Sequence, residues 1–485
     1  MTEGEAKVGK KATRNRVIFI SAVIIIACSF LYINYLSTVF VEVPYLSAYN
    51  YFPMGDKYFA GTLTLGDMRH VISGEHGLLG SCLLFLLNIQ FFGYTTLLDL
   101  VVYVLALLAC GGCIALALGR RMLKEHTIGK EIVYYAFLAM IMADWFAPMQ
   151  KSISGMDIQV RMGTIFSLLI MLYYDELHYR KDRKTFILLL VWIVIGTNIF
   201  GTAYSFAAIP VLCLTVIIRW IKHRKIDTRE LIAMIVWAVC SIAYFFEYHL
   251  IQFHEANNGT LLNNLFQFIT HPVDTFQNIA IYCANFLLGG NPLTYDGLYT
   301  VEEYLYIGYG VMAIIILAIV LFFRMKVYRE TCLPIYLIGY TFFVWLLTML
   351  GQQWHEGIET WMTNEWYFVH TRFAVIGTLW IYALVFRRIR LLAILPVGIL
   401  IGSLIFGMEL QNTRAHHEKG YFQNMQKYLF VDDVAYMPGG DGESPLRLPV
   451  STSMDLIRFL KEHKLNVYRY YDAYHAMMVD EGKAE

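Results

Sequence analysis

Long apolar runs separated by short polar segments make up most of this chain. A helix that crosses a bilayer needs about 20 consecutive apolar residues. Runs of that kind lie at about 17–38, 96–119, 131–147, 158–178, 185–201, 203–221, 230–250, 303–323, 332–350, 367–386 and 391–408. The pattern therefore predicts an all-α polytopic membrane protein with about eleven transmembrane helices. The first run lacks a small-residue cleavage site and is interpreted as an uncleaved span.

The distribution of basic residues predicts the orientation of these helices. If the chain alternates between two sides, 24 of the 38 Lys and Arg residues fall on one side. They form clusters at 7–16, 120–130, 180–184, 219–229, 324–329 and 387–390. The loop 251–303, on the other side, contains no Lys or Arg. Since basic loops stay in the cytosol, the N-terminus is expected there and the C-terminal tail outside.

The polar segments suggest two parts of the chain. Residues 1–408 form the predicted membrane domain, which includes a first outer loop at 39–74 and a second at 251–302. The second loop carries apolar residues at helical spacing, interrupted at His271-Pro272, so we expect two short helices along the interface. Residues 409–485 form a polar extracytoplasmic tail with too few apolar residues for a core of its own. We expect the tail to dock on the membrane domain.

Segment 76–94 is apolar but would break the alternation of basic loops if it crossed the membrane. We interpret it as a re-entrant segment or outer half-helix, and the alternative is a plain surface helix. Re-entrant backbone is tolerated where it is buried in protein or lines a cavity. This interpretation points to a site on the outer face.

Composition narrows the class further. Hydrophobic residues make up 58% of the chain and charged residues 16%, too little polar surface for a soluble globule of this size. The net charge is zero, so no overall basic field favours nucleic acid. The eight cysteines lie in or beside apolar runs and give no disulfide framework. No His/Asp cluster has metal-ligand spacing on one helix, so no metal site is predicted.

The first outer loop is the richest in groups that could transfer protons. Asp56, Glu75 and Glu42 are carboxylates beside many aromatic residues, where a general base can be tuned by partial dehydration. His76 follows Glu75 at the start of the re-entrant segment, and a carboxylate can orient an imidazole. The alternative is an ordinary interfacial loop whose tyrosines belong to the aromatic belt.

Two arginines lie just inside apolar runs, near the predicted outer ends of their helices. A charge there is costly unless it is paired or faces water, so Arg161 and Arg372 are candidates for binding the phosphate of a lipid carrier. Snorkelling to the interface is the alternative. Gln150, Gln159 and Tyr204 are expected at the same end and complete the predicted substrate-binding set.

Several segments carry a resemblance to a known family. They are Val43-Pro44-Tyr45-Leu46-Ser47-Ala48-Tyr49, Gly61-Thr62-Leu63-Thr64, Gly74-Glu75-His76-Gly77, the stretch from Gln150 to Gln159, and the tail segment from Leu460 to Arg469. With the span count and the large first outer loop, they resemble bacterial multi-spanning glycosyltransferases of the GT-C fold, which use lipid-phosphate sugars. The family has an acidic residue or pair where this chain has Ser47-Ala48.

The resemblance implies transfer of a sugar from a polyprenyl-phosphate carrier to a cell-surface glycan or lipid-linked acceptor, outside the bacterial cytoplasmic membrane. The base would then be Asp56 or Glu75, with Glu42 third. A divalent cation becomes an option only where two carboxylates face the outer cavity together. The alternatives are a transporter or lipid flippase, with charges near the bilayer midplane, and a non-catalytic protein of the same fold.

Overall fold

The computed structural model describes most of the predicted membrane domain and parts of the tail. The described residues are 3–42, 51–73, 76–124, 127–147, 156–201, 207–223, 227–248, 260–288, 300–351, 368–386, 397–398, 400–402, 405, 419–420, 423, 426, 436–437, 446–447 and 457–470. The predicted domain boundary at 408/409 lies outside them.

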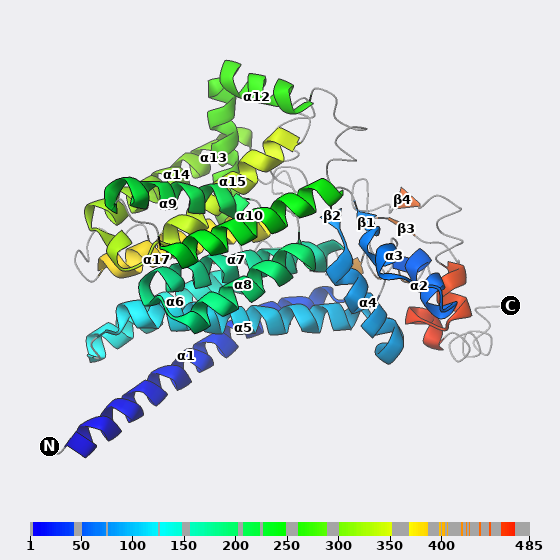
Figure 1. The fold of residues 1–485 in the computed structure, drawn as a ribbon, viewed down its shortest axis with the longest axis horizontal. Coiled ribbons are helices and arrows are strands. Elements are labelled where there is room, and N and C mark those ends of the chain that lie inside the picture. Colours follow the sequence, from blue (N-terminus) through cyan, green and yellow to red (C-terminus); the bar gives the residue numbers. More distant parts are fainter. Residues whose placement is uncertain are drawn as a thin grey trace.

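The described part is built almost entirely from helices (Figure 1). The long helices are α1 (Glu3–Val39), α5 (Thr96–Met122), α6 (Ile128–Trp145), α7 (Met156–Arg180), α8 (Arg183–Asn198), α9 (Ala208–His223), α10 (Thr228–Tyr248), α13 (Pro272–Leu288), α14 (Val301–Arg324), α15 (Leu333–Gly351) and α17 (Phe368–Phe386). The shorter ones are α2 (Phe52–Phe59), α3 (Leu65–Arg69), α4 (Leu79–Phe92), α12 (Thr260–Thr270), η3 (Val327–Arg329) and η5 (Asn466–Tyr470).

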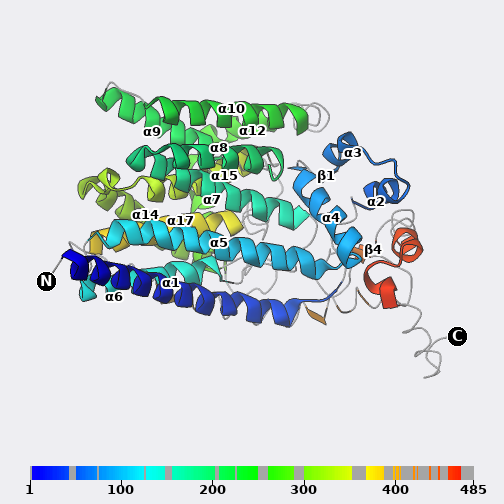
Figure 2. The ribbon, with the colours of Figure 1, turned by 60° about the horizontal axis from the view of Figure 1, so that its bottom comes forward.

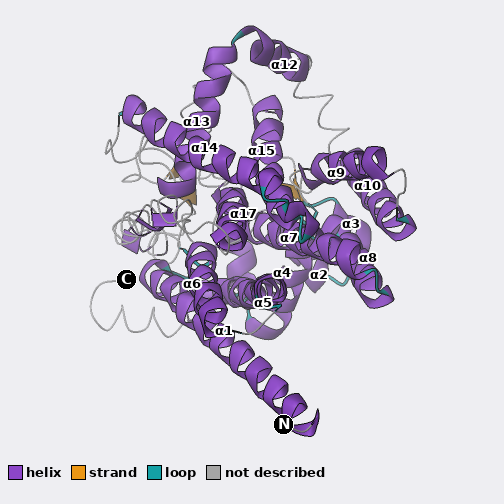
Figure 3. Cartoon of the chain, turned by 90° about the vertical axis from the view of Figure 1, so that its left-hand side faces the viewer, coloured by secondary structure: helices purple, strands orange, loops and turns teal. Residues whose placement is uncertain are grey.

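Two small antiparallel pairs are the strands of the described part. β1 (Ile72–Ser73) pairs with β2 (His76–Gly77), and β3 (Tyr436–Met437) pairs with β4 (Leu446–Arg447). Figure 2 shows α1, α5, α7, α8 and α10 running alongside one another, with α2, α3 and α4 gathered at one end. Seen from the side in Figure 3, α12 and α13 lie at the opposite edge of the bundle from α1.

The helices have the length and composition of an all-α membrane protein. In the described part, four are long and apolar enough to cross a bilayer: Thr13–Thr38, Thr96–Met122, Val301–Arg324 and Leu333–Leu350. Leu79–Phe92, Ala208–Ile217 and His370–Phe386 are shorter apolar helices. Ten of the eleven predicted spans coincide with a helix, and the last, 391–408, lies mostly outside the described residues. The count of about eleven spans stays a prediction.

Basic clusters that are far apart in the sequence meet at one end of the bundle, which we call the basic end. Ion pairs join its helices: Arg16 to Glu131 (2.7 Å), Arg120 to Glu176 (2.8 Å), Arg121 to Asp175 (3.4 Å), Lys124 to Glu330 (3.4 Å) and Lys181 to Asp227 (3.8 Å). The start of α6 and the ends of α5 and α7 therefore lie together. This arrangement agrees with the alternation assumed for the loops, while the side of the membrane that the basic end faces stays a prediction.

The segment predicted to be re-entrant forms the short helix α4 at the opposite end of the bundle. The loop charges predict that this end is extracytoplasmic, and we call it the outer end. At 1.5 Å per residue the 14 residues of α4 span about 21 Å, less than the roughly 30 Å of a hydrocarbon core. Its first turn is tied to α8 because the Gly80 N–H donates to the carbonyl of Ile199 (2.8 Å). The helix ends at Gly93, whose φ of 63° favours glycine.

A second hydrophobic cluster joins the described tail to α2 and α4. Phe459 of the helical run 457–462 packs on Phe52 with ring centroids 5.1 Å apart, and also lies 6.4 Å from Phe85 of α4. Gly55 lies directly beneath the Phe459 ring, so α2 and the tail approach closely. The tail residues thus bury their apolar side chains against the first outer loop.

The second outer loop contains the two helices predicted from its spacing. α12 and α13 meet at His271, where Pro272 begins the second helix. α13 is more than an interfacial helix, because its residues 280–287 are all buried and it packs against α14 and α17. Gly308 of α14 permits this approach, since a Cβ there would clash with the carbonyl oxygen of Ala280.

Candidate functional site

Arg372 and Asp144 form a buried ion pair at the outer end of the bundle. Asp144 lies in the last turn of α6 and Arg372 in the first two turns of α17, and these helices pack on each other. Nη1 of Arg372 lies 2.6 Å from Oδ1 of Asp144, and Nη2 lies 3.5 Å from the carbonyl oxygen of Ala147. The two side chains are 5% and 1% exposed. The guanidinium is therefore held in one orientation.

Arg161 lies in the same region, in the second turn of α7. Its Nη1 donates to the hydroxyl of Tyr32 (3.3 Å), and its guanidinium carbon lies 5.2 Å from the ring centroid of Tyr103. Tyr103 also lies within electrostatic range of Arg372. We call Tyr32, Tyr103, Asp144, Arg161 and Arg372 the arginine cluster. It brings two cations from α7 and α17 around one tyrosine, beside α1, α5 and α6.

Asp144 keeps one oxygen available. Within the described part of the chain, its Oδ2 is buried and has no hydrogen-bond partner. Asp144 also lines a cavity of about 10 Å³, together with Phe286, Leu379 and Leu400. A volume of this size approaches that of one water molecule. The carboxylate thus orients Arg372 with one oxygen, and its second oxygen can accept a hydrogen bond.

His370, two residues before Arg372 on the same helix, is a buried polar residue that sequence reasoning missed. Its Nδ1 lies 3.1 Å from the Tyr340 hydroxyl and 3.4 Å from that of Thr164. The Thr341 hydroxyl donates to the carbonyl oxygen of His370 (2.8 Å), which links α17 to α15. An ionisable residue inside an apolar run is a signal that could have identified it.

Asp56 lies in α2 and is 40% exposed at its side chain. Its contacts run to the tail: Oδ2 lies 3.6 Å from Arg458 and Oδ1 3.9 Å from His463. Both distances are long for an ion pair, and the carboxylate is accessible to solvent. Asp56 therefore belongs to the first outer loop and the tail, apart from the arginine cluster.

Glu42 has contacts that hold the start of α5. Its Oε1 accepts from the Thr96 N–H (2.8 Å) and from the Asn466 amide (2.7 Å), while its Oε2 accepts from the Thr95 hydroxyl (2.8 Å). A carboxylate at a helix N-terminus satisfies an unpaired N–H and complements the helix dipole. Its position gives Glu42 a structural role that joins α1, α5 and the tail.

Gln159 likewise joins three segments. Its Oε1 accepts from the Ser81 N–H (3.1 Å), and its Nε2 donates to the carbonyls of Ile199 (3.1 Å) and Gly201 (3.2 Å). The side chain is fully buried. It therefore fixes the start of α4 against α7 and the end of α8.

The remaining predicted site residues are not placed by the structure. Glu75, Gln150 and Tyr204 lie outside the described residues, as do Ser47 and Ala48. The backbone of His76 is described, paired with Ser73 in the small hairpin, but its side chain is not. The structure thus brings Arg161 and Arg372 together and leaves their relation to Glu75 and His76 as a prediction.

The described residues contain no group of three or more His, Cys, Asp or Glu side chains that could hold a metal ion. Comparisons of the chain with protein-family models, with curated proteins and with solved structures found no match.

Proposed function

We propose that this protein is an extracytoplasmic glycosyltransferase that transfers a sugar from a polyprenyl-phosphate carrier to a cell-surface glycan or lipid-linked acceptor. In this proposal about eleven helices cross the bacterial cytoplasmic membrane, with the N-terminus in the cytosol and the tail outside. The observation that carries it is the arginine cluster, in which Arg161 and Arg372 are buried around Tyr103 at the end of the bundle opposite the basic end.

The arginines would contact the phosphate of the carrier. A guanidinium presents parallel N–H donors that match phosphate oxygens, and a fixed donor stabilises developing negative charge without reorganisation. Asp144 holds Arg372 by Nη1. In a medium of low dielectric the carrier phosphate would interact strongly with both cations.

The base would come from the first outer loop. As the acceptor oxygen bonds to the anomeric carbon, its proton passes to a carboxylate, and the phosphate leaves with the electrons of the broken C–O bond. Asp56 and Glu75 are the candidates, with His76 in support. The accessibility of Asp56 favours this role, whereas both oxygens of Glu42 already accept hydrogen bonds.

A transporter or lipid flippase is the rival function, and the positions of the charges disfavour it. Such proteins bind their substrates near the bilayer midplane. In the described helices from α5 to α17, every charged residue lies within two turns of a helix end. This pattern favours chemistry at a membrane surface.

Transfer assays with separate variants test the proposal. Asp56→Asn and Glu75→Gln would each be assayed with a panel of radiolabelled polyprenyl-phosphate sugars. Asp67→Asn is the control, because Asp67 is a carboxylate of the same loop that caps α3. We expect one of the first two to lose at least about a hundred-fold in rate, as removal of a general base does, and Asp67→Asn to keep most activity. Full activity in both Asp56→Asn and Glu75→Gln would overturn the assignment of the base.

Transfer lost in Arg372→Gln, with the fold retained, would support the phosphate contact. Absence of transfer from every donor, in protein that is folded and embedded in lipid, would favour the non-catalytic protein.

A further inference from the structure

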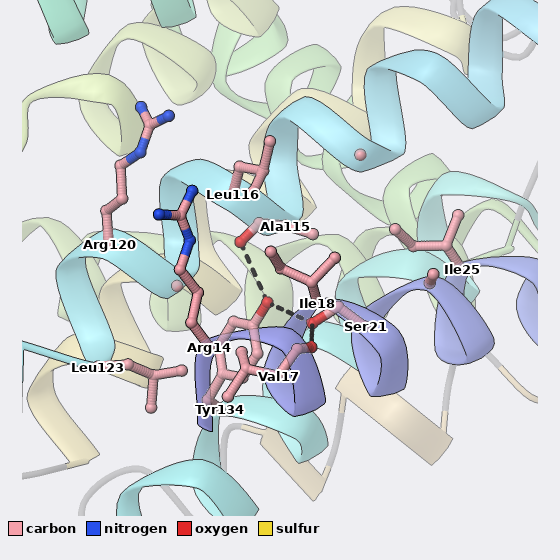
Figure 4. A pocket seen from close by; sticks show the side chains of 13 residues that line it. Arg14, Val17, Ile18, Ser21, Ile25, Ala115, Leu116, Arg120, Leu123 and Tyr134 are labelled. Carbon is pink, nitrogen blue, oxygen red and sulfur yellow. Dashed lines mark hydrogen bonds between the residues drawn. The ribbon is translucent and has the colours of Figure 1, made fainter. Parts of the chain in front are cut away.

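A groove of about 480 Å³ lies between α1 and α5, near the basic end (Figure 4). Its wall on α1 includes Val17, Ile18 and Ile25, and its wall on α5 includes Leu116. Tyr134 of α6 closes the bottom, where its hydroxyl lies 2.9 Å from that of Ser21. The two hydroxyl groups at the bottom of the groove are therefore hydrogen-bonded to each other, and the rest of the lining is mostly apolar.

Small residues make the groove deep. Ala22 faces it from α1, and Gly112, Ala115 and Gly119 face it from α5. A Cβ placed on Gly112 would meet no atom within 4 Å, so there is open space above that position. The groove can thus hold a hydrocarbon chain lying along the helices.

Two arginines lie at the end of the groove that belongs to the basic end. Arg14 comes from α1 and Arg120 from α5, and Figure 4 shows their side chains extending in the same direction. Arg120 pairs with Glu176, which also contacts Arg121 and Arg180, and these two arginines have Asp175 and Asp182 as further partners. Arg14 has no ion-pair partner in the part of the chain that the structure describes. Arg14 therefore leaves an uncompensated positive charge at this end of the groove.

We propose that this groove is a binding site for an anionic membrane phospholipid. One acyl chain would lie along the apolar walls, and the phosphate would sit between Arg14 and Arg120. Basic residues at a helix end attract anionic headgroups, and each buried methylene adds to the affinity for the chain. This site is separate from the arginine cluster, because it lies between the basic halves of α1 and α5.

Retention of lipid by the full-length protein tests the site. The protein would be purified in nanodiscs of equal phosphatidylglycerol and phosphatidylcholine, extracted into mild detergent, and the lipids still bound measured by native mass spectrometry. We expect wild-type protein to retain phosphatidylglycerol in preference to phosphatidylcholine. Arg14→Gln with Arg120→Gln should reduce this retention at least about ten-fold, because both phosphate contacts are lost.

A second variant blocks the binding of the acyl chain and leaves the charges of Arg14 and Arg120 in place. Gly112→Leu fills the open space in the groove and should also reduce retention about ten-fold, whichever headgroup is present. The matched controls are Gly310→Leu and Arg324→Gln on α14, since Gly310 is also open within 4 Å and Arg324 is exposed at the basic end. Both should retain the lipid as the wild type does, and thermal melting of each variant verifies its fold.

The opposing outcomes are distinct. Equal retention in wild type, in Arg14→Gln with Arg120→Gln and in Gly112→Leu would overturn the site. Displacement of phosphatidylglycerol by millimolar inorganic phosphate would overturn the lipid as the ligand and indicate a site for the free anion. Equal retention of phosphatidylcholine and phosphatidylglycerol by the wild type would overturn recognition of the headgroup.

Discussion

Arg372 on α17 and Asp144 on α6 are in contact at 2.6 Å although 228 residues separate them in the sequence. The carboxylate that Arg372 contacts is therefore one at the end of helix α6. The pair is buried, so its members depend on each other for solvation. A buried charge that loses its partner costs more than the pair itself contributes.

We therefore expect Arg372→Leu alone to destabilise the protein by about 3–5 kcal/mol, because Asp144 is left buried and unpaired. The double variant with Asp144→Leu and Arg372→Leu should recover most of that loss of stability. The single Arg372→Leu variant and the double variant should both lack sugar transfer if Arg372 contacts phosphate. Thermal melting in detergent, analysed as a double-mutant cycle, measures the coupling. Additive effects of the two substitutions would show that the pair is not coupled.

The close approach of α13 and α14 predicts a strong effect at one glycine. Gly308→Ala places a Cβ in steric conflict with the carbonyl oxygen of Ala280, so the helices must move apart and stability should fall by about 1–3 kcal/mol. Gly310→Ala, two residues further along α14, meets nothing within 4 Å and should change the melting temperature little. If both variants melt alike, the two helices do not approach as described.

The contacts of Glu42 predict that two substitutions of this residue differ in their effect on stability. Glu42→Ala removes the acceptor for the Thr96 N–H and the Thr95 hydroxyl, and should cost about 1–2 kcal/mol, as the loss of a helix cap does. Glu42→Gln keeps one oxygen acceptor and should retain most stability and most transfer activity. A stable but inactive Glu42→Gln protein would instead point to Glu42 as the base.

Asp67 predicts a pH dependence in the first outer loop. The hydrogen bond from Lys57 (2.5 Å), followed by those from Thr64, holds the pKa of Asp67 well below the ordinary carboxyl value. Because the folded pKa is the lower one, ionised Asp67 stabilises the loop above the ordinary value. This contribution is lost as the pH falls below that value toward the depressed pKa.

Hydrogen exchange of α3 tests this dependence. From neutral pH downward, protection of α3 in the wild type should fall toward that of Asp67→Asn, after correction for the intrinsic exchange rate. The Asp67→Asn protein should show no such dependence. A difference between the two proteins that stays constant down to the lowest pH studied would contradict the prediction.

Local patterns in the sequence determined the helices of this protein. A run of about 20 apolar residues is helical in a membrane because each backbone group must find its hydrogen bond within the segment. The runs at 96–119 and 303–323 accordingly lie on α5 and α14, and the break at His271-Pro272 separates α12 from α13. The segment 76–94 contains the short helix α4, and the alternation of basic loops predicts that it does not cross the membrane.

The candidate site could be predicted only in part. The sequence identified Arg161 and Arg372 because charges in apolar runs are costly, and it placed both at the outer end. It did not identify Asp144 as the partner of Arg372, Tyr103 as the ring beneath Arg161, or Glu42 as an acceptor for the first residues of α5. Those relationships join helices that are distant in the sequence. They are decided by how the helices pack and rotate against one another, which hydropathy and loop charge do not specify.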